Sequence, residues 1–521
     1  MPDIAFATLG EIIERNALIR PDATAMIASK VATSYDAYFG RVRQLVSAFC
    51  ELGARRQDRI AVMAPNGTEF CEAYGAGEYA GFITVTVNFR SSAAEVAHVL
   101  NDSAALILVF HEQYREVVDR AKPWVTTVRH YIVISGAAFA GADLGYENML
   151  KAASGHNRVG RARPEDIAYL IYTSGTTGRP KGCILGQSEV CHRVRMMANL
   201  IEARASDSIL LSMPIFHIGS KLFQMVIGYA GGRAEILTKF EPKTYVAALR
   251  EKEISIAHMA PSMLGELLEQ APHHADIKHL RLVIYSAAPM PVDVLKRGIE
   301  RLGRIFFQGY GQTEGGGTFL GTAQHRPDGD EADRRRLASV GTPYPGAEMR
   351  IVDDDGQDVP TGSPGEILFR APFNMRGYWN QSAATLAALR EGWLHTGDIG
   401  RVDEHGFLYL LDRKKDMIIS GGENIYCSEV EAALATHPAV QDVAVFGVKD
   451  QRWGETVAAA VCLKAGFAPS PHELIEHCKQ QIASYKKPSH IFFMQELPRV
   501  NTGKVDKKNL RESYSPTAAT S

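Results

Sequence analysis

Short apolar runs alternate with stretches of helical spacing along most of the chain. Such runs, rich in β-branched and aromatic side chains, predict strands at residues 59–64, 82–87, 105–110, 167–172, 208–213, 233–238, 254–259 and 280–285. The first helical stretch begins with a capping box, in which Thr8 is the cap and Glu11 lies three residues later. Ile12 and Ile13 lie on the apolar face of this predicted helix. The alternation predicts α/β layers.

From about residue 339 the pattern changes to paired strands joined by polar turns. Strands are predicted at residues 348–352, 366–370 and 407–411, with turns at 353–356 and 403–406. The charged run DRKKD, residues 412–416, follows the last of these strands. We therefore expect a β-rich subdomain that ends near this run.

The last hundred or so residues predict a small α+β domain. Ser428 with Glu431, and Ser470 with Glu473, each have the spacing of a capping box, the second with Pro471 at the first helical position. Strands are predicted at residues 443–448, 457–463 and 491–494. The expected fold is thus an α/β protein with a large N-terminal domain of layered subdomains, residues 1–412, a hinge at 413–415, and a small C-terminal domain, 416–521.

Composition and charge limit the kinds of partner that we expect. The 521 residues are 45% hydrophobic and 22% charged with a net charge of −2, and no long run of Lys or Arg stands out. This balance gives no reason to expect a nucleic acid, so we expect small-molecule partners. Oligomeric state is not fixed by these features; a homodimer is one arrangement that they allow.

The cellular compartment can be predicted from the cysteines and from the first residues of the sequence. The seven cysteines are scattered and never spaced as C-x-x-C, which argues against a disulfide framework or a zinc site. The start of the sequence lacks a secretory pattern, and no apolar stretch reaches the ~18 residues of a membrane span. We expect a cytoplasmic protein.

The segment YTSGTTGRPKG, residues 172–182, follows a predicted buried strand directly. Its hydroxyls and glycines let donors approach an anion closely, and Lys181 adds a positive charge. The segment is not a Walker loop, because Pro180 and Gly182 stand where that motif needs Gly and Ser or Thr. It indicates a polyphosphate site formed by Thr173, Ser174, Gly175, Thr176, Thr177, Gly178 and Lys181.

The chain resembles the adenylate-forming (AMP-forming) acyl-CoA synthetases, in the branch of fatty-acid and aryl-acid CoA ligases. The resemblance rests on several motifs in the family's order over nearly the whole chain: residues 172–182, SAAP at 286–289, GYGQTE at 309–314, GWLHTGDIG at 392–400, SGGENIY at 420–426 and VNTGK at 500–504. It implies ATP, Mg²⁺ and coenzyme A as cofactors and co-substrates.

The resemblance also assigns nucleotide contacts. Tyr310 would stack on adenine, Thr313 would contact the α-phosphate, and Glu314 would help to hold magnesium. Asp398 would accept hydrogen bonds from the ribose hydroxyls, with Arg413 nearby. The remaining nucleotide-binding residues implied are Ala287, Ala288, Pro289, Gly309, Gly311 and Gln312.

In the C-terminal domain the resemblance makes Lys504 the catalytic lysine of adenylation and Lys415 the hinge about which this mobile domain turns. Coenzyme A would approach Ser420, Gly421, Gly422 and Trp453. Two positions depart from the family pattern. Cys427 replaces a common proline, and Gly186-Gln187 replaces a common Thr-His, which puts a loop contact to the nucleotide in doubt.

The acyl pocket is implied at PIFHIGSK, residues 214–221, where His217 often gates the tunnel in the family. The pocket residues would be Phe216, His217, Ser220 and Lys221, and we expect the Lys221 amine to point to solvent rather than to meet a polar group of the substrate. The implied reaction is adenylation of a carboxylic acid followed by transfer of the acyl group to coenzyme A, with release of AMP and pyrophosphate.

The leading substrate is a medium- or long-chain fatty acid, and a benzoate- or cinnamate-type aryl acid is the alternative. Two other functions stay open at this point. One is an adenylating enzyme that loads a carrier protein, and the other is a non-catalytic sensor of nucleotide or acyl ligand. The retained Lys181, Glu314, Asp398, Arg413 and Lys504 argue against the sensor.

Overall fold

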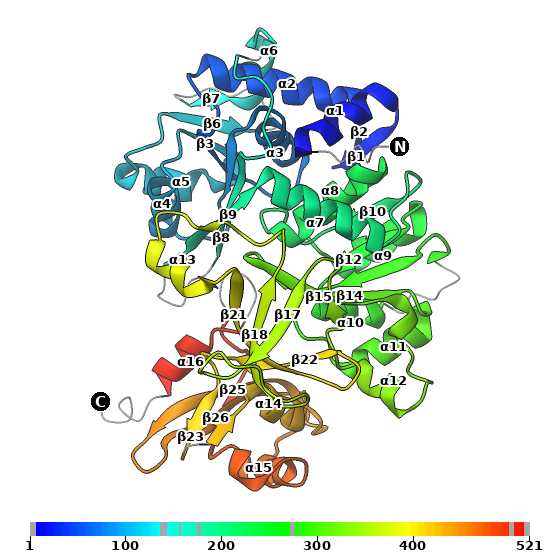
Figure 1. Ribbon diagram of the computed structural model, residues 1–521, viewed down its shortest axis with the longest axis vertical. Coiled ribbons are helices and arrows are strands. Elements are labelled where there is room, and N and C mark those ends of the chain that lie inside the picture. The colour runs from blue at the N-terminus through cyan, green and yellow to red at the C-terminus, as the bar shows by residue number, and fades with distance from the viewer. Residues whose placement is uncertain are drawn as a thin grey trace. The chain divides into compact units, whose positions relative to one another are not determined.

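The computed structural model describes residues 7–135, 143–155, 158–173, 179–270, 277–421, 423–499 and 505–514. The chain forms two compact units (Figure 1). The larger comprises Met1–Met349 with Phe369–His395, and the smaller comprises Arg350–Leu368 with Thr396–Ser521. The expected α/β fold with a large N-terminal part and a smaller C-terminal part is confirmed.

The first sheet of the larger unit is mostly parallel. Its strands, in spatial order, are β16 (Thr342–Pro343), β15 (Gly315–Leu320), β14 (Phe306–Gln312), β13 (Leu282–Tyr285), β12 (Ile256–Met259), β10 (Ser208–Leu211), β11 (Arg233–Ile236), β1 (Thr24–Ala28) and β2 (Val31–Ser34). From β10 the chain runs outward to β11, then returns to the other side of β10 for β12, β13 and β14. The strand order therefore reverses at β10 and β12.

The second sheet of this unit has the order β19 (Gly377–Tyr378), β9 (Lys181–Gly186), β8 (Ile167–Thr173), β4 (Ile83–Thr86), β3 (Arg59–Met63), β5 (Ile107–His111), β6 (His130–Ile134) and β7 (Leu144–Gly145). The inner strands β8, β4, β3, β5 and β6 are parallel, and β9 returns antiparallel to β8. The predicted strands coincide with these elements to within a few residues.

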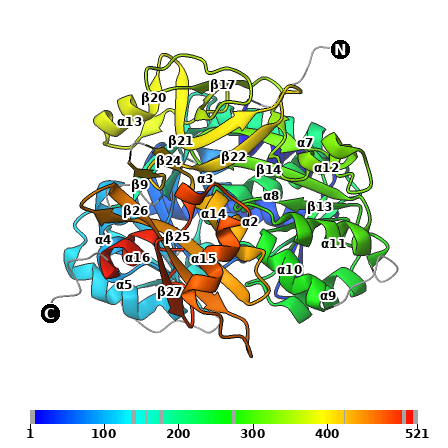
Figure 2. The ribbon, with the colours of Figure 1, turned by 90° about the horizontal axis from the view of Figure 1, so that it is seen from below.

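Helices pack on both faces of these sheets, so the strands are buried on both sides. α3 (Thr68–Ala80), α7 (Gln187–Leu200) and α8 (Ile218–Ala230) share one core with inner faces of both sheets, and Figure 1 shows α7 and α8 side by side. α9 (Pro242–Glu251), α10 (Pro261–Glu269) and α11 (Val292–Leu302) cover the opposite face of the first sheet, and lie together in Figure 2. The other helices of this unit are α1 (Leu9–Ile19), α2 (Tyr35–Glu51), α4 (Ala93–Asp102), α5 (Arg115–Ala121), α6 (Tyr146–Ala152), α12 (Glu331–Arg336) and α13 (Ser382–Ala388).

A third sheet carries the predicted meander, in the order β17 (Glu348–Val352), β18 (Gly365–Arg370), β21 (Trp393–Val402) and β20 (Leu389–Arg390), with β22 (Leu408–Arg413) paired to β21. The division between the two units falls within β17, β18 and β21. The domain boundary predicted at residues 412–416, from the charged run after the last apolar strand, is a different division and stays a prediction.

The fourth sheet belongs to the smaller unit. Its order is β24 (Glu423–Ile425), β23 (Ile418–Ser420), β26 (Gly454–Leu463) and β25 (Val440–Asp450), with β27 (His490–Met494) parallel to β26. The helices of this unit are α14 (Cys427–Ala435), α15 (Pro471–Lys479) and α16 (Lys507–Ser513). Among the described helices, none combines the length and apolar character that a bilayer crossing requires.

The three predicted capping boxes can be compared with the helix starts. The Thr8–Glu11 box is present at α1, and Ser470 caps α15 by accepting a hydrogen bond from the backbone of Glu473. The box predicted at Ser428 is wrong, because α14 already begins at Cys427. The Ser428 hydroxyl donates instead to the carbonyl of Leu411, a residue far away in the sequence.

Candidate active site

The predicted phosphate loop starts and ends on neighbouring strands. Thr173 is the last residue of β8 and Lys181 the first of β9, and the two are paired across the antiparallel ladder. The loop residues between them that were predicted to contact phosphate, Ser174, Gly175, Thr176, Thr177 and Gly178, lie outside the described residues.

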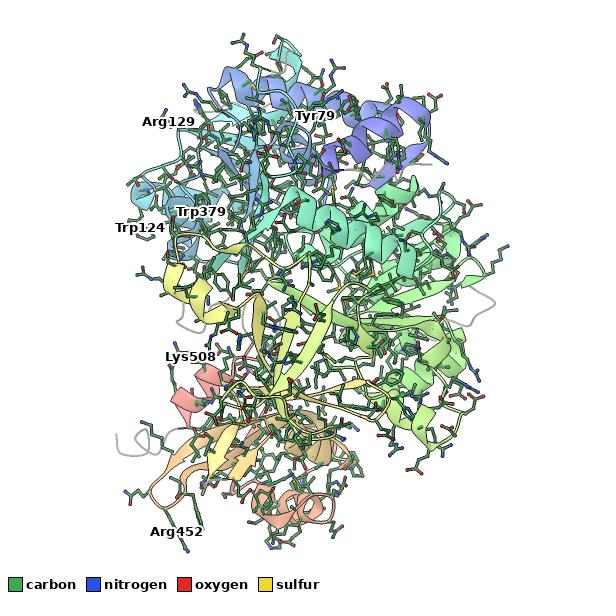
Figure 3. The ribbon with its side chains drawn as sticks, in the orientation of Figure 1. Tyr79, Trp124, Arg129, Trp379, Arg452 and Lys508 are labelled. Carbon is green, nitrogen blue, oxygen red and sulfur yellow. The ribbon has the colours of Figure 1, made fainter. Side chains whose placement is uncertain are left out.

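Helix α4 anchors both stems of this loop. Before the loop, the Tyr172 hydroxyl donates to the Asp102 carboxylate at 2.6 Å. After the loop, His98 Nε2 lies 3.1 Å from the carbonyl oxygen of Pro180. Trp379, labelled in Figure 3, donates through Nε1 to the backbone carbonyl of Asp102 at 3.1 Å. The two stems are therefore fixed to one rigid element.

Glu314, in the turn between β14 and β15 of the first sheet, accepts hydrogen bonds from two hydroxyls of the second sheet. The Thr173 hydroxyl donates to Glu314 Oε1 at 3.3 Å, and the Tyr378 hydroxyl donates to the same oxygen at 2.9 Å. Lys181 Nζ lies 4.2 Å from the centre of the Tyr378 ring. Burial, with the nearby Glu314 charge, raises the pKa of Tyr378, so its hydroxyl stays protonated and remains a donor. The result is a positioned carboxylate beside a cation.

The hairpin that carries Glu314 depends on a run of three glycines. Gly315, Gly316 and Gly317 have φ values of +137°, +62° and +133°, which residues with a Cβ rarely adopt. The Gly316 amide donates to Asn374 Oδ1 at 2.9 Å, and a Cβ at Gly316 would collide with the ring of Phe369. This close packing fixes the turn in which Thr313 and Glu314 lie. Of the other predicted nucleotide residues, Gly309, Tyr310, Gly311 and Gln312 form the end of β14.

The SAAP segment leaves the first sheet at the end of β13. Ala287 is exposed and has φ of +74°, in the left-handed region. That conformation is costly for a residue with a Cβ, and such strain is concentrated at ligand sites. Ala288 and Pro289 are exposed beside it, as a surface for a planar base requires.

The segment implied for the acyl pocket leads into α8. Phe216 is buried, and its ring centre lies 4.2 Å from that of His217, which occupies the N-cap position of the helix. Ser220 is also buried, and its hydroxyl donates to the backbone carbonyl of Met213 at 3.0 Å. Ser220 therefore fixes the helix start.

The expectation that Lys221 points to solvent is wrong. Its side chain is 1% exposed, and Nζ lies 2.7 Å from the carboxylate of Glu78, which is itself 3% exposed. Nζ also donates to Gln224 Oε1 at 2.7 Å and lies 4.5 Å from the centre of the Tyr74 ring. The partner is on α3, so the spacing within α8 could not reveal it. The signal that could have done so is the presence of Glu69, Glu72 and Glu78 among the small and apolar residues of α3, since a buried carboxylate needs a cation.

In the smaller unit the structure brings Asp398 and Arg413 together. They face each other on β21 and β22, and Arg413 Nε lies 3.0 Å from Asp398 Oδ1. Asp398 is 6% exposed, and its amide donates to the Thr396 hydroxyl at 3.0 Å. The arrangement holds a carboxylate in a fixed orientation with a guanidinium as its counter-ion.

The predicted hinge and coenzyme A residues lie farther along this unit. Lys415 is exposed in a turn after β22. Gly421 has φ of +61°, and a Cβ there would lie 2.8 Å from the ring of Trp453, so the glycine lets the backbone pack on the indole. Ser420 ends β23. Arg452, labelled in Figure 3, lies over the same indole at 4.5 Å. Gly422 and Lys504 lie outside the described residues.

Both departures from the family pattern have structural partners. The Gln187 side chain is buried and accepts from the backbone of Leu9 at 3.0 Å. The Cys427 amide donates to the Asp412 carboxylate, and its thiol donates to the carbonyl of Asp416 at 3.0 Å. Each departure therefore takes part in long-range packing.

A divalent cation would have one protein carboxylate here. Among the described residues no group of three or more His, Cys, Asp or Glu side chains could hold a metal. Glu314 fits the way Mg²⁺ is bound in nucleotide enzymes, through one or two carboxylates together with substrate phosphates. Sequence reasoning missed Tyr378 and Asn374, which hold Glu314 and its hairpin, because they lie in a segment that carried no motif.

Comparison with known proteins agrees with this geometry. The family profile described as "AMP-binding enzyme" matches residues 13–379, and that described as "AMP-binding enzyme C-terminal domain" matches residues 429–504. The chain is 31% identical to the long-chain-fatty-acid–CoA ligase FadD13 of Mycobacterium tuberculosis, over 98% of this chain and 99% of the relative. It is also 31% identical to a feruloyl-CoA synthase from Amycolatopsis, over 97% and 99%.

A solved structure supports the same conclusion. The o-succinylbenzoate CoA synthetase of Bacillus subtilis, in complex with its acyl-adenylate intermediate, superposes with a TM-score of 0.86 and 28% identity, over 96% of this chain and 97% of that one. The matched family profiles, together with this fold, define an adenylate-forming enzyme. The chain belongs to the AMP-binding enzyme family, among the AMP-forming acyl-CoA synthetases, as the motifs predicted.

Proposed function

We propose that the protein uses Mg-ATP to convert a carboxylic acid into an acyl-adenylate and passes the acyl group to coenzyme A, releasing pyrophosphate and AMP. The observation that carries this proposal is the Glu314 cluster. A carboxylate held by Thr173 and Tyr378, with Lys181 beside it, lies where the predicted phosphate loop leaves β8. This is a site for a charged phosphate chain.

Different residues of the chain would bind the different parts of Mg-ATP. When bound, magnesium would neutralise phosphate charge, and Glu314 would hold it. Lys181 and Thr313 would orient the phosphates, and Tyr310 would lie against the base. In the smaller unit, Asp398 would accept from the ribose hydroxyls, with Arg413 as its counter-ion.

We further propose that Lys504 supplies the cation for adenylation and that the C-terminal domain turns about Lys415 between the two half-reactions. The displacement at phosphorus gathers negative charge, so preorganised donors and cations matter more than a base. In the second half-reaction the Gly421–Gly422 loop and Trp453 would line the approach of the thiol.

The test is Lys504→Ala in single-turnover assays. Loss of one such charge contact costs about 2.7–4 kcal/mol, or about 10²–10³ in rate. We expect adenylate formation to fall by that factor while thioester formation from supplied adenylate is spared. Lys508→Ala is a matched control, because Lys508 on α16 is a 75% exposed lysine (Figure 3). Equal loss in both half-reactions would contradict the role.

The acid that we propose is a medium- or long-chain fatty acid, with an aryl acid as the alternative. Phe216 and the apolar residues of α8 support an apolar pocket. The relatives named above include both a long-chain-fatty-acid ligase and a feruloyl-CoA synthase, so they do not discriminate. Pyrophosphate release across fatty and aromatic acids, with coenzyme A present, would identify the class.

A further inference from the structure

His258 lies where the first sheet changes direction. It is on β12, paired with Leu211 of β10, and the strand order reverses between these two strands. In open α/β sheets, ligands bind in the crevice outside the carboxyl ends of the strands at such a reversal. The Phe216–His217 segment leaves β10 at this edge, and the SAAP segment leaves β13 at the same edge. His258 is therefore placed beside the segments implied for substrate binding.

The imidazole of His258 bridges two of these segments. Its ring centre lies 4.5 Å from that of Phe223 on α8, and Nε2 lies 2.9 Å from the hydroxyl of Ser286, the first residue of SAAP. The residue is 1% exposed. Its environment thus consists of an aromatic ring on one side and the start of the adenine-side loop on the other.

The second ring nitrogen lacks a partner. Within the part of the chain that the structure describes, His258 Nδ1 contacts no hydrogen-bonding group, and neither do Ser212 Oγ after β10 nor Gln308 Oε1 on β14. Buried polar atoms are nearly always satisfied in native proteins, so unsatisfied ones call for an explanation. His258 and Ser212 lie near the ends of the adjoining strands β12 and β10, whereas Gln308 lies two strands away from β12, on β14. The pair at the adjoining strand ends points to a polar ligand group that completes the bonding there.

The chemistry of the ring limits what that group can be. Burial lowers the pKa of His258 to about 3, so the imidazole is neutral near pH 7 and has one N–H and one lone pair. If Nε2 carries the proton and donates it to Ser286, Nδ1 accepts a hydrogen bond. If Nε2 accepts from Ser286, Nδ1 carries the proton and donates. A hydroxyl suits both tautomers, because it donates and accepts, whereas a carboxylate only accepts.

We infer that His258 is a specificity-determining residue that binds a hydroxyl on the acyl part of the substrate through Nδ1, so that the enzyme prefers hydroxylated carboxylic acids. The inference rests on the proposed ligase function. It names the hydroxyl and leaves its carrier, an aromatic ring or an aliphatic chain, to the experiment.

The first experiment uses the wild-type enzyme and matched pairs of acids. We would measure kcat/KM for coenzyme A ester formation with para-hydroxycinnamic against cinnamic acid, and with ω-hydroxydodecanoic against dodecanoic acid. A buried neutral hydrogen bond predicts a preference of about tenfold to a hundredfold for the hydroxylated member of one pair. The pair that shows it identifies the carrier.

Two substitutions locate the effect on one nitrogen. In His258→Asn the amide group occupies the place of Nδ1, and in His258→Gln it occupies the place of Nε2 near Ser286. We expect Asn to retain the preference and Gln to lose it. The ratio of kcat/KM values within each variant does not depend on how much of the protein is folded.

The outcomes separate the two proposals. If no acid supports pyrophosphate release, the ligase function is overturned. If acids are turned over but neither hydroxylated member is preferred, the inference alone is overturned. A preference that survives in His258→Gln and disappears in His258→Asn would also overturn it, because Nε2 would then be the contact.

Discussion

Helix α8 separates two buried polar side chains whose surroundings differ. Side chains two positions apart on an α-helix are rotated by about 200° around the helix axis, so Lys221 and Phe223 point to opposite faces of α8. On the first face, Lys221 has Glu78, Gln224 and the Tyr74 ring as partners. On the second, Phe223 packs on His258, whose Nδ1 has no described partner.

The difference follows from charge. A buried ion without its counter-ion costs several kcal/mol, so the interior must provide every partner of Lys221. A neutral imidazole that lacks one hydrogen bond costs much less, and a ligand can later supply that bond. The complete network is therefore expected to act on stability, and the incomplete one on substrate choice.

The largest effect is expected when the Lys221–Glu78 network is broken. Lys221→Met leaves the Glu78 carboxylate buried without its cation, and should lower the free energy of unfolding by about 3–5 kcal/mol. The measurement is the denaturant midpoint of the purified protein. The double variant Lys221→Met, Glu78→Gln removes both charges and should recover most of the loss. An unchanged midpoint in the single variant would show that the pair is not structural.

A smaller effect on stability is expected from the Tyr169 hydroxyl, which belongs to the same network. The Tyr169 hydroxyl donates to Glu78 Oε1 at 2.5 Å, a bond to a charged group. Tyr169→Phe should therefore cost about 1.5–3 kcal/mol. A double-mutant cycle with Glu78→Gln checks the assignment, since the cost should shrink when the charge is gone. Equal costs in both backgrounds would place the effect elsewhere.

The smallest effect, taken over one pH unit, concerns the acid range and His258. His258 has a folded pKa of about 3, below the ordinary value of about 6.5, so between these values the unfolded chain binds a proton that the folded protein does not. Stability therefore falls as the pH drops through this window, by about 1.4 kcal/mol per pH unit from this residue. His258→Asn should flatten the fall in unfolding midpoints, whereas Lys508→Ala, at an exposed position of α16, should leave its slope unchanged.

Sequence reasoning succeeded where the signal is local. The strands β8, β10 and β12 were found from apolar runs. The polyphosphate loop stems, the GYGQTE hairpin and the Asp398–Arg413 pair lie in segments whose motifs predicted a site, and their roles there stay predictions. Their contacts follow from strand pairing, which alternation in the sequence encodes.

The failures share one cause, which is a partner far away in the sequence. Lys221 reads as a surface charge within α8, and only Glu78 on α3 makes its burial tolerable. Ser428 reads as a helix cap, but its hydroxyl is used by Leu411 at the end of another strand. His258 was not singled out at all, because a single histidine in an apolar run gives no sign of which nitrogen will be paired.

The amide of Cys427 has a consequence for anyone who wishes to engineer this chain. Proline stands at this position in many relatives, and a pyrrolidine nitrogen has no hydrogen to give. Burial raises the pKa of Asp412, and the backbone donors of Arg413 and Cys427 act against that shift. Restoring the common proline would thus remove one of the two backbone donors to this carboxylate, so a consensus repair here would need a second change at residue 412.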